Sequence, residues 1–86
     1  MKHAGPAALA RLEALLGLLR LRPGLIEKRP GVFYRRGRAF QQFHEDPAGL
    51  FVDNRSGEDW DRMPVNDAME HVRLIVTVDR ALVEVA

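Results

Sequence analysis

The chain has 86 residues, of which 47% are hydrophobic and 29% are charged, and it carries a formal net charge of +1 and no cysteine. This length fits a single domain over residues 1–86, and the composition is that of a folded globular protein, which excludes an intrinsically disordered chain. Without cysteine the protein forms neither a disulfide nor a thiolate-bound metal site, so we expect it to depend on an efficient core or on a partner subunit.

The first predicted element is a helix over residues 6–21. Gly5-Pro6 is typical of a helix start, because proline is tolerated in the first turn. Leucines then repeat at steps of three and four residues and form one apolar face, which comprises Leu9, Leu12, Leu15, Leu16 and Leu19. Pro23-Gly24 follows and ends the helix.

A three-stranded antiparallel meander is predicted next, after a short extended segment at residues 25–30. Aromatic and apolar residues favour strands at residues 32–35, 38–45 and 50–53. Arg36-Gly37 is suited to a two-residue hairpin turn, and Asp46-Pro47-Ala48-Gly49 has the residue preferences of a type I turn.

The C-terminal part is predicted as a loop followed by a helix. Residues 54–64 are polar and acidic, and we expect a loop with Trp60 folded back over one end of the core. Asn66 then caps a helix over residues 66–85, whose apolar residues keep a 3.6-residue period. Leu74–Val78 is rich in β-branched residues, so a pair of strands stays open as the alternative.

The element order α-β-β-β-α predicts an α+β fold. We expect a three-stranded antiparallel meander with both terminal helices packed on one face. The other face of the sheet is then open to solvent or to a partner.

The residues from Pro30 to Phe40, PGVFYRRGRAF, together with Phe43-His44-Glu45-Asp46, resemble the middle of the small bacterial MmcQ/YjbR-type proteins. The resemblance covers roughly residues 9–53 and includes a leading helix, a Pro-Gly step, an aromatic strand and a hairpin return. It implies a cytoplasmic protein with a sheet-and-helices fold and a suggested DNA-binding role. It implies no catalytic residue, and this chain is shorter than typical members.

The sequence contains no pattern typical of an enzyme or cofactor site. The single serine, Ser56, has no histidine nearby in the sequence to activate it, and the glycines lack the spacing of a phosphate loop. His44 and Asp46 share one strand face, but a metal site would need two more ligands and only Asp53 lies across the hairpin. We therefore expect no catalytic residue, no cofactor and no metal, and a local structural role for His44.

The predicted hairpins divide the strand residues between two sheet faces, because directly opposed residues point to the same side. One face is expected to form the core beneath the helices and comprises Val32, Tyr34, Ala39, Gln41, Phe43, Leu50 and Val52. On the other face, Phe33 pairs with Phe40 and His44 with Phe51. That face combines aromatic and basic side chains and, with the turn residue Arg36, is the candidate binding surface: Phe33, Arg35, Arg36, Arg38, Phe40, His44 and Phe51.

Three interpretations of this surface stay open. Exposed phenylalanines are costly unless covered, which predicts a homodimer interface. A reversed or slipped register would instead place the phenylalanines in the core. Arginines beside aromatic rings on an open sheet also resemble platforms for single-stranded nucleic acid, here with Arg35, Arg36, Arg38, Lys28 and Arg29 as the basic residues.

The charges are unevenly distributed along the chain. Residues 1–44 carry nine lysines and arginines against two glutamates, whereas residues 45–86 carry four arginines against ten acids. We expect the two halves to fold against each other with interleaved charges; an anion-binding face and self-association are the alternatives.

These observations predict a small non-catalytic binding domain that acts as a homodimer through the aromatic sheet face. Nucleic-acid binding through the basic hairpin is the alternative. No run approaches 18 apolar residues, so we expect no membrane span, and the lack of cysteine and of a secretory signal pattern favours the cytoplasm.

Overall fold

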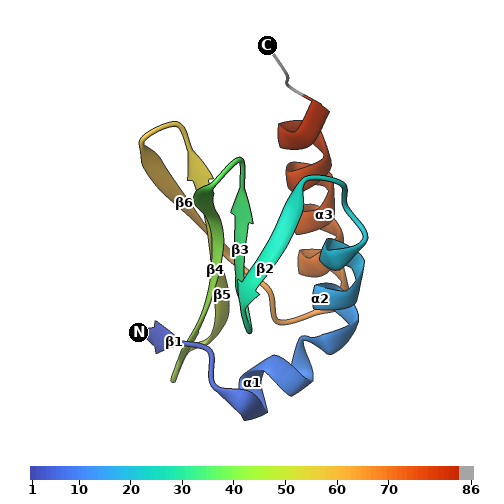
Figure 1. Cartoon of the computed structure of the whole chain (residues 1–86). Coiled ribbons are helices and arrows are strands. Elements are labelled where there is room, and N and C mark those ends of the chain that lie inside the picture. Colours follow the sequence, from blue (N-terminus) through green and yellow to red (C-terminus); the bar gives the residue numbers. More distant parts are fainter. Residues whose placement is uncertain (84–86) are drawn as a thin grey trace.

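The computed structural model describes residues 1–83, which form one antiparallel sheet with three helices on one side of it (Figure 1). The predicted α+β class is therefore confirmed. In chain order the elements are β1 (Lys2–His3), α1 (Pro6–Arg11), α2 (Glu13–Arg20), β2 (Leu25–Arg29), β3 (Val32–Arg35), β4 (Arg38–Asp46), β5 (Gly49–Ser56), β6 (Asp59–Pro64) and α3 (Ala68–Val83).

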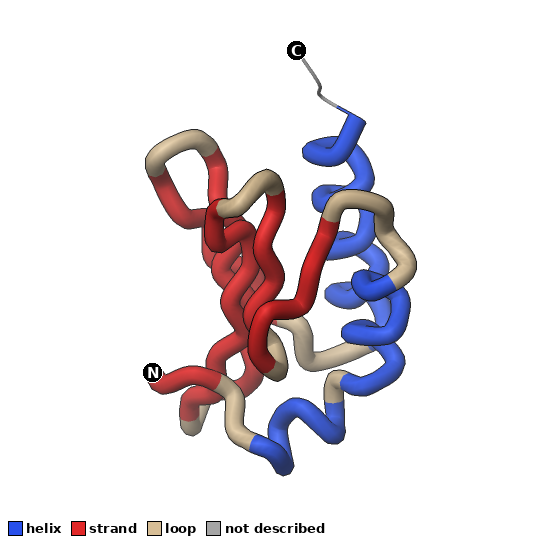
Figure 2. Tube along the Cα trace, viewed as in Figure 1, coloured by secondary structure: helices blue, strands red, loops and turns tan. Residues whose placement is uncertain are grey.

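Within residues 1–83 the sheet has six strands, so the predicted three-stranded meander is too small. Five strands pair in the order β2-β3-β4-β5-β6, and β1 pairs with the part of β4 that lies beyond β3. The helices cover one face of this sheet, with α2 and α3 side by side (Figure 2). No helix within residues 1–83 lies on the opposite face.

The segment 54–64, predicted as a loop, is the end of β5 and all of β6. These strands form a hairpin about Gly57, which has a φ of 63°. The edge strand β6 is exposed along most of its length, so its sequence lacks the alternating apolar residues that identify a half-buried strand. Trp60 lies on β6 opposite Arg55 and is 38% exposed, so the prediction that it covers the core is wrong.

The positions of the two predicted turns are confirmed. Arg36 and Gly37 have φ values of 54° and 77°, the pattern of a type I′ turn, whose twist matches that of the adjoining strands. At the second turn Asp46 pairs with Gly49, and the Asp46 carboxylate accepts a hydrogen bond from the Ala48 N–H at 3.1 Å. Each turn sets the register of the two strands that it connects, at the residues next to the turn.

The predicted helix over residues 6–21 is present, but it is broken into α1 and α2. Leu12 lies at the break with a φ of −100° and a ψ of 5°, outside helical geometry, while its side chain is 1% exposed. Its N–H donates to the Leu9 carbonyl at 3.0 Å, which tightens the last turn of α1. Within residues 1–83 no helix is both long and apolar enough to cross a membrane.

The C-terminal element is a helix, as predicted, with residues 84 and 85 of the prediction outside the described residues. Its cap is Asp67 and not Asn66: the Asp67 carboxylate accepts the Glu70 N–H at 2.8 Å, and the Glu70 carboxylate accepts the Asn66 N–H at 2.7 Å. The Asn66 amide instead bonds both the N–H and the carbonyl of Leu50, at 2.7 and 3.2 Å. Asn66 thereby ties the start of α3 to β5.

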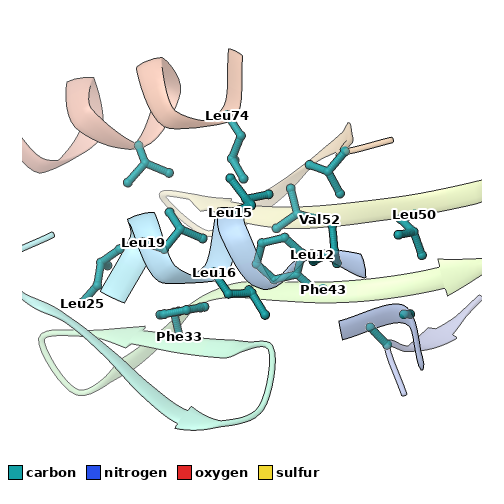
Figure 3. Close-up of a cluster of buried hydrophobic side chains, with 14 of the residues drawn as sticks. Leu12, Leu15, Leu16, Leu19, Leu25, Phe33, Phe43, Leu50, Val52 and Leu74 are labelled. Carbon is teal, nitrogen blue, oxygen red and sulfur yellow. The ribbon is translucent and has the colours of Figure 1, made fainter. Parts of the chain in front are cut away.

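The core lies between the helices and the covered face of the sheet. Leucines of α2 and the preceding break are almost fully buried against sheet residues and Leu74 of α3 (Figure 3). The Phe33 and Phe43 rings meet edge to face with their centroids 6.4 Å apart. The fully buried side chains include Leu12, Leu15, Leu16, Leu19, Phe33, Phe43, Val52, Val65, Leu74 and Val78.

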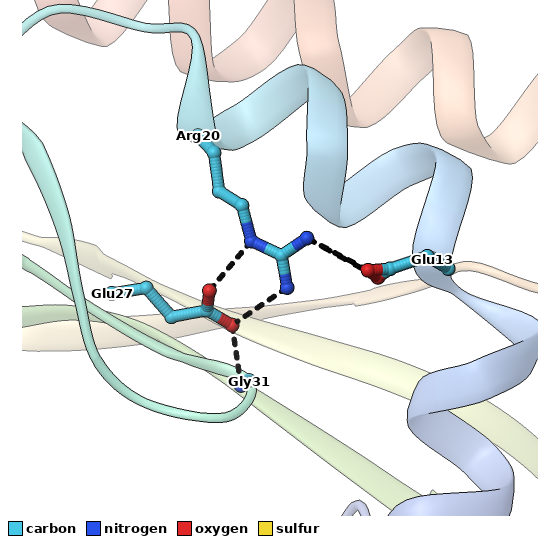
Figure 4. A network of polar contacts seen from close by, with 4 residues as sticks. All are labelled: Glu13, Arg20, Glu27 and Gly31. Carbon is cyan, nitrogen blue, oxygen red and sulfur yellow. Dashed lines mark hydrogen bonds and ion pairs between the residues drawn. The ribbon is translucent and has the colours of Figure 1, made fainter.

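An ionic network fixes α2 against the β2–β3 hairpin (Figure 4). Arg20 Nε donates to Glu27 Oε1 at 2.6 Å, and its Nη1 donates to Glu13 Oε1 at 2.8 Å. Glu27 also accepts the Gly31 N–H at 3.0 Å. The hydrogen bonds from Arg20 lower the pKa of the Glu27 carboxyl, which burial alone would raise. The network therefore holds α2 in one orientation.

Candidate functional site

Two residues of the predicted surface belong to the core. Phe33 and Phe40 are 0% and 6% exposed, so the prediction that they lie on an open face is wrong. Phe33 pairs with Gln41 rather than with Phe40, because Phe40 is an extra residue in β4. At such a bulge two residues face one, which interrupts the alternation of faces, and Phe40 and Gln41 are both buried. The alternative of a slipped register, with the phenylalanines in the core, is therefore correct for Phe33 and Phe40.

His44 and Phe51 pair directly, as predicted, on the sheet face that carries no helix. Their neighbours Phe43 and Val52 are core residues, and alternation turns His44 and Phe51 to the opposite side. The His44 ring is half-buried there, 4.9 Å from the ring of His3 on β1. This part of the sheet is thus partly covered by the N-terminal strand.

His44 belongs to a charged cluster with Asp53 and Arg62. His44 Nε2 lies 3.1 Å from Asp53 Oδ2, and Arg62 donates to both carboxylate oxygens of Asp53 at 2.8 Å. The bidentate bonds from Arg62 lower the pKa of Asp53, and burial lowers the pKa of His44 although the Asp53 charge opposes it. Arg62 therefore balances the Asp53 charge, and the neutral form of His44 is favoured at pH 7.

This arrangement does not provide a general base. Both ring nitrogens of His44 are shielded from solvent, and a base must reach the proton that it takes. Within residues 1–83, no three His, Asp or Glu side chains are placed to hold a metal ion. The cluster accordingly has the geometry of a structural contact between β4, β5 and β6.

The lowered pKa of the half-buried His44 predicts a loss of stability in weak acid. Because its folded pKa is lowered, the unfolded chain binds a proton below about pH 6.5 that the folded chain rejects. We expect the free energy of unfolding to fall by up to about 1.4 kcal/mol per pH unit below that point. Urea titrations at pH 7.5, 6.5, 5.5 and 5.0 measure this slope.

The matched variant for this prediction is His44→Phe, which keeps a ring beside His3 and removes the titrating group. It is expected to flatten the slope between pH 6.5 and 5.0 and to leave the later loss, from Asp53 below about pH 4, in place. An unchanged slope in the variant would contradict a neutral His44 in the folded protein.

Four arginines gather where β3 turns into β4 and β5 turns into β6. They line a depression of about 200 Å³ that also includes Ala39, Phe40 and Gly57. We name this group, Arg35, Arg36, Arg38 and Arg55, the arginine end. Three of its members come from the predicted surface, and the structure adds Arg55.

Two of these guanidinium groups are anchored to the main chain. Arg35 Nη1 donates to the Ala81 carbonyl of α3 at 3.1 Å, and Arg55 Nε donates to the Ala39 carbonyl of β4 at 2.6 Å. A guanidinium has five N–H donors, so each anchored group keeps donors for a ligand. Arg38 lies 3.5 Å from Glu58, and both side chains of that pair are largely exposed.

An aromatic side chain adjoins the arginine end. The Arg55 guanidinium stacks 4.4 Å from the centroid of the Trp60 ring, across the β5–β6 hairpin. Sequence reasoning missed Arg55 and Trp60 because it assigned both to a loop. The Ser56-Gly57 dipeptide, a common turn signal, was the feature that could have revealed the hairpin.

The other predicted basic residues lie elsewhere. Lys28 and Arg29 are at the far end of β2, where Arg29 pairs with Val32, whereas Leu25 at the other end of the strand pairs with Arg35. The Lys28 ammonium lies over the Tyr34 ring, 5.5 Å from its centroid. The structure therefore separates Lys28 and Arg29 from the arginine end.

No family model, curated protein or solved structure matches this chain. The resemblance to MmcQ/YjbR-type proteins stays a prediction.

Proposed function

We propose that the chain is a non-catalytic binding domain that holds single-stranded nucleic acid at the arginine end. The observation that supports this most is the convergence of four arginines from two hairpins on one depression. Guanidinium groups bind phosphate with paired N–H donors, and two of these groups are already held in place by main-chain carbonyls. A pre-positioned group loses less conformational entropy when it binds.

Trp60 supports a single-stranded ligand over free phosphate. Trp60 is 38% exposed and its ring lies beside Arg55, so a phosphate on the arginine would bring an unpaired base within reach of the ring. Asp59 and Asp61, its neighbours on β6, point to the opposite side of the strand because successive side chains alternate. Asp59 and Asp61 therefore lie on the side of β6 opposite Trp60, while Glu58 in the β5–β6 turn pairs with Arg38.

The test is fluorescence anisotropy with a labelled oligothymidylate of about 12 nucleotides, within the usual site size for such domains. Four phosphate contacts predict a slope of log affinity against log salt of about −3, at about 0.7 per contact. We expect the double variant Arg36→Gln/Arg38→Gln to reduce the slope by about 1.4. Trp60→Ala is expected to cost ~1–3 kcal/mol at every salt concentration.

The matched control is Arg73→Gln/Arg80→Gln, which removes the same charge from the exposed side of α3. It should leave the slope nearly unchanged, because those residues lie outside the arginine end. Equal losses in the two double variants would indicate non-specific attraction, and an oligonucleotide that does not bind below about 100 μM at low salt would refute the proposal.

A further inference from the structure

The outer surface of the helix layer carries a cluster of exposed hydrophobic side chains. These residues project from α3, from the C-terminal part of α2 and from the residue that follows α2, on the side away from the sheet. We name them the outer helix face: Leu18 (45% exposed), Leu21 (77%), Met69 (60%), Val72 (57%), Val76 (42%) and Val83 (76%).

The helical period places the α3 members on one stripe. Residues 69, 72, 76 and 83 follow at steps of three, four and seven, whereas the buried residues Leu74 and Val78 lie on the other side of the helix. Leu18 and Leu21 are likewise turned away from the buried Leu15–Leu16 and Leu19 of α2. None of the residues in these two stripes belongs to the hydrophobic core.

An ion pair joins the two stripes into one face. Arg22, just after α2, donates from Nε and Nη2 to the two carboxylate oxygens of Asp79 on α3, at 3.0 and 3.2 Å. These hydrogen bonds lower the pKa of Asp79 and raise that of Arg22. Both groups are charged and neutralise each other where the end of α2 meets α3.

We infer that a second copy of the chain packs on the outer helix face and forms a homodimer. The inference goes beyond the proposed nucleic-acid binding, because this face and the arginine end share no residue. Sequence reasoning expected a homodimer through the aromatic sheet face; the burial of Phe33 and Phe40 removes that surface, and the inference assigns the contact to the helices instead.

The exposed apolar area is close to the lower limit for a stable dimer. A full aliphatic side chain offers on the order of 100 Å² of apolar surface, and the six residues average about 60% exposure. Two copies would therefore bury on the order of 700 Å² of apolar surface. The smallest stable interfaces bury about 1,200 Å² in total, of which about 65% is apolar in homodimers.

Charge sets a condition on the contact with a second copy. In a two-fold symmetric interface the same surface of both copies is used. The Arg22–Asp79 pair is balanced on each copy. Arg73 and Arg80 are also exposed on α3, so the contact must place these two arginines at its rim, where solvent screens their charge.

Sedimentation equilibrium of the full chain tests the inference. At about 50–200 μM we expect a mass of twice the 9.7 kDa chain. Val76→Asp is expected to weaken self-association at least about 10-fold, because it places a charged carboxylate in the middle of the apolar stripe on each copy. Ile26→Asp is the matched control: Ile26 is 61% exposed on β2, outside the outer helix face, and this variant should stay dimeric.

Circular dichroism melts check that each variant folds, and Leu18→Asp on α2 probes the same face if Val76→Asp does not fold. Dimeric wild type and Ile26→Asp with monomeric Val76→Asp or Leu18→Asp would support the inference. A wild-type monomer at about 200 μM would overturn it and leave the face to a different partner or to none. Variants that dissociate no more than Ile26→Asp would overturn it as well.

Discussion

Phe33→Ala is expected to destabilise the folded protein by ~3–5 kcal/mol. The side chain is fully buried and meets the Phe43 ring edge to face, so its removal leaves a cavity between β3 and the leucines of α2. Small domains have a total stability of only ~5–15 kcal/mol, so the variant is expected to be partly unfolded at physiological temperature. Urea unfolding followed by circular dichroism measures the loss.

Phe51→Ala is the control for this prediction, because it removes the same ring from the helix-free face of the sheet. Phe51 is only half-buried, and its neighbour across the ladder is His44. We expect it to cost less than half as much as Phe33→Ala. Similar costs for the two variants would contradict the assignment of Phe33 to the core and of Phe51 to the open face.

The second large effect is expected at a buried amide pair. Gln41 is 0% exposed and donates from Nε2 to Asn54 Oδ1 at 2.9 Å, while Asn54 donates to the Met63 sulfur at 3.3 Å. Among the described residues, Gln41 Oε1 has no hydrogen-bond partner. Asn54→Leu would leave the whole Gln41 amide unpaired in the core, and we expect a cost of ~2–3 kcal/mol.

The double variant Gln41→Met/Asn54→Leu distinguishes this cause from a packing defect. Replacing both amides with apolar side chains of similar shape removes the unpaired groups, so we expect the stability to return to within ~1 kcal/mol of the wild type. A double-mutant cycle from urea unfolding at pH 7 gives the coupling energy. Costs that simply add would show that the two amides act independently.

The polar pair also explains why the helix-facing side of the sheet differs in its two halves. Phe43 and Val52 are apolar beneath the α2 leucines, whereas Gln41 and Asn54 lie further along the same strands, toward the arginine end. Gln41 also pairs with Phe33 across β3. We expect this pairing to hold one register of β4, since a slip would leave both amides without partners.

The sequence alone determined the features that depend on neighbours a few residues apart. The leucine period from Leu9 to Leu19, the Arg36-Gly37 turn and the period of residues 68–83 each require only local contacts, and each is present in the structure. The pairing of the residues next to both turns was also predictable, because a two-residue turn sets the register of the two strands that it connects.

Only the tertiary structure decided which residues face the core and which gather at the surface. The bulge at Phe40 fits a buried ring between β4 and α3, and a run such as Phe40-Gln41-Gln42 has no local signal for the extra residue. One extra residue in β4 shifts its pairing with β3 by one position. Phe33 therefore pairs with the buried Gln41 and lies on the core side of the sheet. The arginine end likewise exists because β4–β5 pairing brings Arg55 beside residues 35–38, and pairing between distant segments leaves no trace in the local sequence.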